Sequence, residues 1–359
     1  MLILGIESSC DETAAAVVED GLRVRSSVVA SQADLHAEYG GVVPEIAGRA
    51  HVERISPVIE SSLREAGVGL GDLDAVAVGH RPGLIGSLLV GVGAAKALSW
   101  SLGVPLVGVD HVHAHLWAAL LGRPRDEVGE ALPSLGLVVS GGHTAMYKMG
   151  SATALTRLGA TIDDALGEAY DKAATMLGLG YPGGPALDAL ARAEGADPDA
   201  WRLPISTLGP DSLDFSFSGL KTAVLYAIRG VPRPKREGGG FPRPLGSLSD
   251  SGRRDLAAAF QRTAVRTAVL KLERALDGWG GEAGGGGPRS LIAGGGVTSN
   301  SLLRSELAAL GRRRGLGVLL PEPAHCVDNA AMIAGLGHES LAERGADGLT
   351  LAAVPTTAC

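Results

Sequence analysis

The stretch LILGIESSCDETAAAVVED, residues 2–20, joins two apolar runs through a short polar turn. The runs at residues 2–7 and 13–20 predict strands, and a third run at residues 23–32 extends them into a β-meander. The same arrangement returns at residues 134–160, in SLGLVVSGGHTAMYKMGSATALTRLGA. Helical patterns follow both meanders, so the chain is predicted to be an α/β protein with a coarse internal duplication.

Apolar spacing and turn residues place the remaining elements. Further strands are predicted at residues 74–79, 105–110, 289–297 and 317–321. Helices are predicted at residues 44–66, 87–102, 164–177, 185–193, 219–228, 255–277, 299–313 and 329–344. Two segments rich in proline, glycine or charge, residues 231–252 and 278–288, are predicted to be loops within the second half of the chain.

The composition is that of an ordinary globular protein, with 45% hydrophobic and 20% charged residues over 359 positions. The formal net charge of −7 argues against a surface that coats nucleic acid generally, but it leaves room for a local basic patch or a helping partner. Cys10, Cys326 and Cys359 form no CxxC pair, which fits a reducing compartment. The chain starts without the basic segment of a signal peptide, and its longest apolar stretch, residues 82–95, is too short to span a bilayer. We therefore expect a soluble cytoplasmic protein that does not associate with membranes.

Three histidines stand in the stretch DHVHAH, residues 110–115, where a predicted strand gives way to a helix. Ligands of open α/β sheets bind at this end of a strand. His111 and His115 are four residues apart and share one helix face, whereas His113 points elsewhere. Asp328 lies at another junction before a helix, and two histidines with one carboxylate suit zinc or iron(II). The alternative interpretation is that these residues only cap and pack a crowded helix start.

Polar or glycine-rich turns follow several predicted strands. ESSCDET (residues 7–13) and VVSGGHT (138–144) occupy equivalent places in the two meanders, where backbone amides of facing turns could hold a nucleotide phosphate. AGGGVTSN (293–300) leads into a helix start, which attracts anions. GYPGGP (180–185) follows Asp171, an acid that suits ribose hydroxyls. Each segment also fits an ordinary hairpin, helix cap or solvated face without a ligand.

Eight motifs occur in order between residues 5 and 332: GIESSCDET, HAEYGGVVPEIAGRAH, DHVHAH, LVVSGGHT, TIDDALGEAYDKAATMLGLGYPGGP, LDFSFSGLKT, GGGVTSN and CVDNAAM. This set resembles the tRNA adenosine threonylcarbamoyltransferase family over nearly the whole chain. The resemblance implies the actin/sugar kinase/Hsp70-like (ASKHA) fold, in which two ribonuclease-H-like lobes enclose a nucleotide cleft. It implies a first lobe of residues 1–118 and 326–354 and a second lobe of residues 119–325, with the two predicted loops as insertions.

The resemblance also implies a reaction. The enzyme would transfer the threonylcarbamoyl group of threonylcarbamoyl-AMP to the exocyclic amine of the adenosine 3′ to the anticodon, and it would release AMP. The substrates would be tRNAs that read codons beginning with adenine. The implied partners are the tRNA anticodon loop, a paralogous ASKHA subunit and a small P-loop ATPase. The implied cofactor is one divalent metal ion per subunit, iron(II) or zinc.

Matched residue by residue, the resemblance implies three sets of site residues. The metal ligands are His111, His115 and Asp328. The substrate-binding residues are Val138, Val139, Ser140, Gly141 and Gly142 of the second turn and the nucleotide contacts Asp171, Gly184, Asp188 and Asn300. The candidate catalytic residues are Asp11 and Glu12 of the first turn.

One segment departs from the family pattern. The family usually reads Thr-x-Gly-Pro-Gly-Leu where this chain has GHRPGL, residues 79–84. We hypothesise that Arg81 enlarges the positive field near the cleft; the alternatives are a lower activity or simple drift of the loop. FSFSGLKT, residues 215–222, marks the family without an assigned chemistry, and its serines and Lys221 are candidates to shape an interlobe or partner surface.

Three rival functions follow from the same residues. An ASKHA kinase or ATPase would bind its nucleotide through magnesium and carboxylates, so the histidine pair with Asp328 argues against it. A metallopeptidase of the HExxH class needs glutamate directly after the first histidine, where this chain has Val112. An inactive nucleotide-binding paralogue is disfavoured by the intact set of metal ligands.

Overall fold

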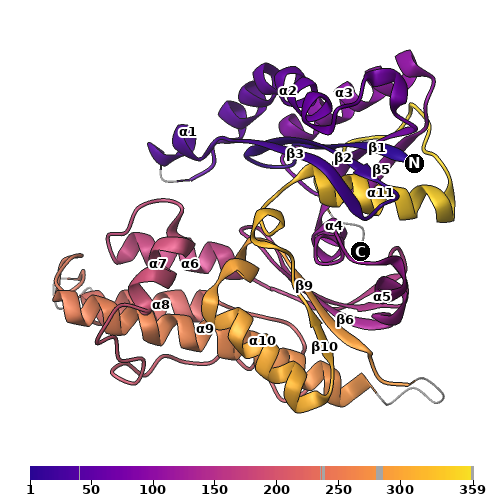
Figure 1. Cartoon of the computed structure of the whole chain (residues 1–359). Helices are drawn as coiled ribbons and strands as arrows, with labels where there is room; N and C mark the ends of the chain where they lie inside the picture. Colours follow the sequence, from indigo (N-terminus) through magenta and orange to yellow (C-terminus); the bar gives the residue numbers. More distant parts are fainter. Residues whose placement is uncertain (40, 235, 237–238, 280–285, 357–359) are drawn as a thin grey trace.

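The computed structural model describes residues 1–39, 41–234, 236, 239–279 and 286–356. The elements form two lobes, one above the other in Figure 1, and each lobe is built on a five-stranded sheet. The elements of the first lobe are β1 (Leu2–Glu7), β2 (Glu12–Glu19), β3 (Arg23–Ser31), α1 (Ala33–Ala37), α2 (Pro44–Ala66), β4 (Ala75–Arg81), α3 (Ile85–Leu102), β5 (Leu106–Asp110) and α11 (Ala330–Arg344). A short helix, α4 (His111–Ala118), leaves this lobe.

The first sheet has the strand order β3-β2-β1-β4-β5. The meander β1–β3 is antiparallel, and β4 and β5 join it in parallel. Successive side chains of a strand point to opposite faces, and β1 shows this directly. Leu4 and Ile6 pack with α2 and α3, whereas Ile3 packs with α11. Because helices cover both faces, the strands are continuous apolar runs.

The second lobe repeats this topology. Its elements are α5 (Arg125–Glu130), β6 (Ser134–Val139), β7 (Thr144–Met149), β8 (Leu155–Ala160), α6 (Leu166–Met176), α7 (Gly183–Ala191), α8 (Ser218–Arg229), α9 (Asp250–Gly278), β9 (Ser290–Gly294), α10 (Ser301–Arg314) and β10 (Gly317–Leu319). The sheet order, β8-β7-β6-β9-β10, is again an antiparallel meander followed by two parallel strands. The predicted α/β class and internal duplication are thereby confirmed.

Helices α4 and α11 lie between the two sheets (Figure 1). One buried cluster contains residues of both helices together with side chains from both sheets, including Val109 of β5 and Val138 of β6. The helix α4 begins where β5 ends because the Asp110 side chain accepts hydrogen bonds from the amides of Val112 and His113. The lobes are therefore joined through a packed core at the place where the histidines stand.

The structure corrects some predicted boundaries. The helix α9 begins at Asp250 rather than residue 255, because Ser249 caps it by accepting a hydrogen bond from the amide of Gly252. The predicted loop at residues 231–252 therefore ends at Ser249, three residues earlier than expected. The short helices α1 and α5 were not predicted, since five or six residues are too few for a periodic signal. Of the predicted loop at residues 278–288, residues 280–285 lie outside the described part of the chain.

Among the described residues, α3 alone is long and apolar enough to cross a membrane. It packs on α2 and β4 as an element of the first lobe, and about one third of its residues are buried there. Its length and composition are equally those of a helix in a folded domain.

Candidate metal and nucleotide site

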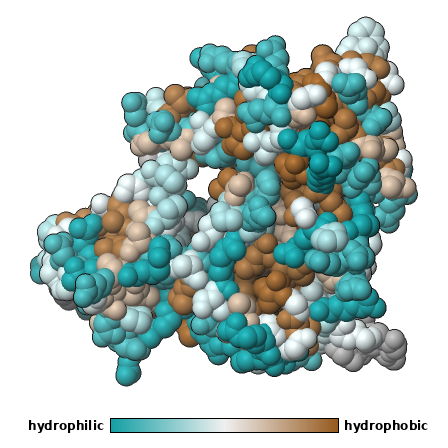
Figure 2. Space-filling model, viewed as in Figure 1, coloured by the Kyte–Doolittle hydropathy of each residue, from teal (hydrophilic) through white to brown (hydrophobic). Residues whose placement is uncertain are grey.

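The predicted site residues converge on the space between the lobes. Figure 2 shows a deep notch in the molecular surface between the two lobes. The charge of Asp11 on the first lobe raises the pKa of Asp171 and of Tyr181 on the second, although burial is the larger cause for both groups. The turn that carries Asp11 therefore faces the α6–α7 region across the notch.

His111, His115 and Asp328 come together as predicted. Their ligand atoms lie within 4.8 Å of one another, and all three side chains are largely shielded from solvent. Oδ1 of Asp328 lies 3.2 Å from Nε2 of His115 and 3.6 Å from Nε2 of His111. Two tetrahedral ligands at metal distances of about 2.1 Å stand about 3.4 Å apart. The spacing therefore fits one ion held by both imidazoles and the carboxylate.

The hydrogen-bonding state of His115 supports a metal site independently. Nδ1 of His115 is buried without a hydrogen-bond partner among the described residues, and Nε2 has only the Asp328 carboxylate, 3.2 Å away and outside hydrogen-bond geometry. A buried polar atom left in this state is costly unless another group binds it. A cation at the three ligand atoms would satisfy Nε2 of His115, so the residues present fit a metal ion.

Glu7 orients His111 from behind. Its Oε2 lies 2.9 Å from Nδ1 of His111, and the hydroxyl of Ser9 lies 3.2 Å from the same nitrogen. Burial favours neutral His111, but the carboxylates of Glu7 and Asp328 outweigh it and raise the pKa of His111 to about 10. With Nδ1 engaged by Glu7, Nε2 is turned toward Asp328, the arrangement in which a carboxylate fixes the tautomer of a metal-binding histidine.

Acidic and imidazole groups surround the three ligands. Burial, followed by the charges of Asp328 and Asp11, raises the pKa of Glu12 to about 9, so Glu12 carries its proton at neutral pH. The ring of His143, from the second turn, lies 6.5 Å from that of His111. Burial and the charges of His111 and His115 lower the pKa of His143 to about 4, which makes it a neutral imidazole.

The second turn presents backbone rather than side chains. Val138 and Val139 are buried in the two cores, so their side chains face away from the notch. Ser140 is fixed by a bond from its amide to the carbonyl of His143, and its hydroxyl accepts from the amide of His143. Gly141 and Gly142 are exposed, with nothing within 4 Å of the position of an added Cβ. A ligand can therefore approach this backbone closely.

The four predicted nucleotide contacts form two groups. Asp171 accepts hydrogen bonds from the amides of Gly183, at 2.9 Å, and Gly184, so α6 is tied to the start of α7. Asp188 accepts from the side chains of Asn300, at 3.2 Å, and Ser301, at 2.8 Å. The Asn300 amide also donates to Gln261 on α9, and its oxygen caps α10. The second group is therefore a buried network that joins three helices.

Several residues near the site escaped the sequence analysis. Glu7 is an acid at the end of an apolar strand, and the sequence alone shows an acid in that position. His143 was quoted within its motif without a role. His51 of α2 binds the first turn, since Nδ1 lies 2.7 Å from the Thr13 hydroxyl and Nε2 lies 3.0 Å from the carbonyl of Cys10. His113 does point away, with its ring against Tyr147.

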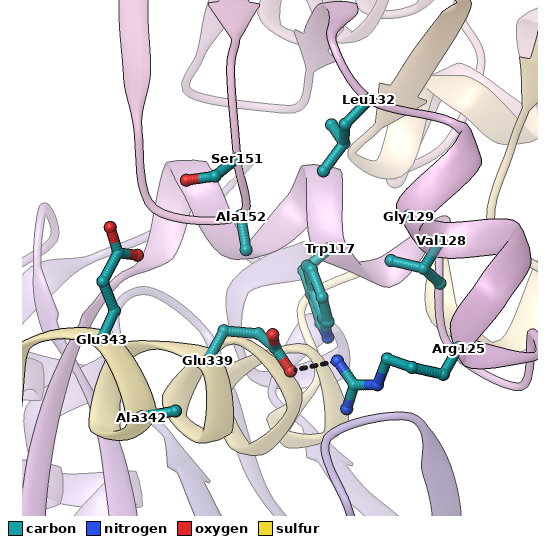
Figure 3. A pocket seen from close by; sticks show the side chains of 10 residues that line it. All are labelled: Trp117, Arg125, Val128, Gly129, Leu132, Ser151, Ala152, Glu339, Ala342 and Glu343. Atoms are coloured by element: carbon teal, nitrogen blue, oxygen red, sulfur yellow. Dashed lines mark hydrogen bonds and ion pairs between the residues drawn. The ribbon is translucent and has the colours of Figure 1, made fainter.

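A separate pocket of about 390 Å³ lies on the outside of the junction between the lobes (Figure 3). It is lined by the end of α4, by α5, by the turn between β7 and β8 and by α11. An ion pair of 2.7 Å between Arg125 and Glu339 crosses it, and Trp117 donates to the carbonyl of Gly21 at 3.0 Å. None of the predicted site residues lines this pocket, so it is distinct from the metal cluster.

Known proteins are similar to this chain over nearly its whole length. The family model described as tRNA N6-adenosine threonylcarbamoyltransferase matches residues 23–335. The tRNA N6-adenosine threonylcarbamoyltransferase of Solidesulfovibrio magneticus is 49% identical over 360 residues, which cover 99% of this chain and 93% of that protein. The enzyme of the same name from Symbiobacterium thermophilum is 50% identical over 338 residues, which cover 94% and 91%.

Among solved structures, component A of the (R)-2-hydroxyglutaryl-CoA dehydratase from Acidaminococcus fermentans superposes with a TM-score of 0.53. The match covers 96% of this chain and 100% of that chain at 13% sequence identity. At that identity the likeness concerns the fold alone.

Proposed function

This chain belongs to the tRNA N6-adenosine threonylcarbamoyltransferase family, and from that premise we propose how its residues carry out the reaction. The protein transfers the threonylcarbamoyl group of threonylcarbamoyl-AMP to the exocyclic amine of the adenosine 3′ to the anticodon and releases AMP. Its fold is the predicted ASKHA fold. The kinase, inactive-paralogue and peptidase alternatives are not favoured.

We propose that His111, His115 and Asp328 hold one divalent ion, iron(II) or zinc. The observation that carries this proposal is the convergence of the ligand atoms of His111, His115 and Asp328 within 4.8 Å of one another. A bound ion would supply Lewis-acid polarisation and a template for the oxygens of the adenylate. Glu7 would keep His111 in the tautomer that leaves Nε2 free to bind.

The AMP part of the substrate fits the second lobe. We propose that Ser140, Gly141 and Gly142 approach its phosphate through their backbone, because no side chain obstructs the two glycines. Asp171 and Gly184 would bind the ribose from the α6–α7 junction. The buried network of Asp188 and Asn300 would hold the facing helix starts in place.

We propose that the first turn handles the proton of the attacking amine. Forming the new carbon–nitrogen bond breaks the bond between the carbonyl carbon and the phosphate oxygen, and the amine nitrogen must lose one proton. We propose that Asp11 accepts this proton, while protonated Glu12 donates a hydrogen bond within the site. An adenosine amine is a weak nucleophile, so its placement against the carbonyl carbon would supply much of the rate.

The partner proteins are proposed on the same basis. The exposed face of α3 carries Ile85, Leu89 and Trp100, and Val52 of α2 is also exposed. We propose that the paralogous ASKHA subunit covers this apolar face, since singly exposed apolar residues are common but clustered ones mark interaction sites. We also propose that a small P-loop ATPase is a partner and that the protein is cytoplasmic. We further propose that residues 1–118 and 326–354 form the first lobe and residues 119–325 the second.

The test is the transfer reaction with purified protein, its partner proteins, ATP, threonine, bicarbonate and unmodified tRNA. After digestion, threonylcarbamoyl-adenosine is sought by mass. We expect product with the wild type and with His113→Ala, whose ring lies outside the cluster, and none with His111→Ala. Product with His111→Ala would reduce the histidines to a packing role. Absence of product with the wild type, given a verified partner set, would contradict the activity itself.

A further inference from the structure

The segment between α8 and α9 carries an unusual concentration of positive charge. Residues 229–243, RGVPRPKREGGGFPR, contain five basic residues and one acid, in a chain whose formal net charge is −7. We call the described residues 229–234 and 239–243 of this stretch the basic segment. Figure 1 shows it at the outer edge of the second lobe, beside α7 and α8, on the side where the notch between the lobes opens.

The two ends of the basic segment are fastened together. The amide of Arg243 donates to the carbonyl of Arg229 at 3.0 Å, and Nε of Arg229 donates to the carbonyl of Arg243 at 3.2 Å. The Arg229 guanidinium also stacks over the ring of Phe241, 4.2 Å from its centre. Nearer the tip, the amide of Arg233 donates to the carbonyl of Gly240 at 2.8 Å. These contacts hold Arg229, Arg233 and Arg243 at defined places.

These arginines keep their charge available. Within the described part of the chain, no carboxylate lies within ion-pair distance of Arg229, Arg233 or Arg243. Other arginines of this lobe are paired, as Arg262 is with Asp199 and Arg314 with Asp277. Arginines that form no ion pair with an acid, next to exposed aromatic surface, suit phosphate and nucleic-acid recognition.

The basic segment is also linked to the proposed nucleotide site. Residues on either side of it, Ile228 and Leu245 among them, line a cavity of about 480 Å³ together with Thr175–Gly178, at the end of α6. The same helix carries Asp171, which lies four residues before Thr175, about 6 Å nearer the start of the helix at 1.5 Å per residue. An RNA whose adenosine enters the notch beside Asp171 therefore has backbone within reach of the arginines.

We propose that the basic segment binds the phosphate backbone of the substrate tRNA, and this rests on the proposed function. The partner is RNA rather than an acidic protein, because the substrate of this enzyme is a polyanion that the acidic remainder of the chain repels. The contacts position the tRNA and read no base. A local basic surface of this kind reconciles the net charge of −7 with an RNA substrate.

The experiment measures binding of unmodified tRNA to the enzyme with its partner proteins, over a series of salt concentrations. In one variant Arg229, Arg233 and Arg243 are all replaced by glutamine; in a second all three are replaced by lysine. Both variants lose the hydrogen bonds from the guanidinium groups to backbone carbonyls, but only the lysine variant keeps the positive charge. Comparing the two variants therefore separates the effect of charge from the effect of loop structure. Arg312→Gln, at an exposed position near the end of α10, is the matched control.

We expect the glutamine variant to bind tRNA at least roughly tenfold more weakly, with a salt dependence flatter by about one ion per lost contact. The lysine variant and Arg312→Gln should stay near the wild type, and the KM for threonylcarbamoyl-AMP should not change. Unchanged tRNA binding by the glutamine variant would overturn the proposal, as would loss of partner proteins without loss of tRNA. A wild type that transfers nothing would instead contradict the proposed function.

Discussion

The Nε atom of Arg81 lies 3.2 Å from Oδ2 of Asp110, the residue that caps α4 directly before His111. The register of β4 and β5 places the two residues opposite each other at the ends of their strands. Asp110 is buried, and its other oxygen holds the amides of Val112 and His113. Arg81 thus directs its charge at a buried acid, rather than only enlarging the field of the cleft as we hypothesised.

Arg81→Gly is expected to lower stability and activity together, because it leaves the Asp110 carboxylate buried without its cation. Arg81 is about one third exposed, so solvent screening limits the loss to about 1 kcal/mol. Thermal unfolding and turnover would measure this. Arg81→Lys, which keeps a cation, should recover most of the loss. Wild-type stability and turnover in Arg81→Gly would remove any role for the ion pair.

Glu7→Gln is expected to weaken metal binding by about 10- to 100-fold, since the carboxylate no longer fixes the tautomer of His111. Titration of the metal-free protein with zinc would measure the affinity. Glu19→Gln is the matched control, because among the described residues Glu19 forms ion pairs only with Arg23 and Arg25, at the edge of the first sheet. Equal affinities in the two variants would mean that His111 does not depend on Glu7.

His51 fastens α2 to the first turn, and its protonation should loosen that contact. Burial lowers the pKa of His51 below its usual 6.5, so the neutral ring both donates to Cys10 and accepts from Thr13. The unfolded chain takes up a proton more readily than the native protein does. The stabilisation is therefore complete above about pH 6.5 and is lost as the pH falls toward the folded pKa.

The measurement is the free energy of unfolding of the wild type and of His51→Gln, which keeps a donor for Cys10 and does not titrate. Between about pH 7 and about pH 5 the wild type should lose stability relative to the variant. A constant difference between the two proteins over this range would show that His51 does not titrate as its environment suggests. His51→Ala should in addition raise the KM for threonylcarbamoyl-AMP, because Asp11 and Glu12 lie within the turn that His51 holds.

Much of the fold could be predicted because its signals are local. The strands of each meander are unbroken apolar runs, and the second meander repeats the first, so the class and the duplication follow from the sequence. The spacing of His111 and His115 likewise places both rings on one helix face. Asp328 was offered as the third ligand because it lies at another junction before a helix, and the family resemblance implied the same residue.

The contacts that support the site could not be predicted in the same way. Glu7 and His111 are 104 residues apart, and a single sequence does not show which buried acid meets which histidine. The exposure of Gly141 and Gly142 depends on how the two lobes pack. Two glycines of AGGGVTSN serve the packing of the chain itself: a Cβ on Gly294 would collide with the carbonyl of His115, and one on Gly295 with that of Val139.

The close packing around Gly295 can be tested by substitution. Gly295 has φ +98° and ψ 160°, a conformation that is essentially restricted to glycine, and its missing Cβ leaves room for the Val139 carbonyl. Gly295→Ala should therefore cost at least about 3 kcal/mol of the free energy of unfolding and shift the turn at Ser140. Its neighbour Gly296 has open space around the Cβ position and no positive φ, so Gly296→Ala should leave stability unchanged or raise it by up to about 1 kcal/mol. Denaturant unfolding of the two variants decides the point. Similar stabilities would mean that the close contact between β9 and the end of β6 does not constrain the second turn, and Gly295→Ala would then also retain its affinity for threonylcarbamoyl-AMP.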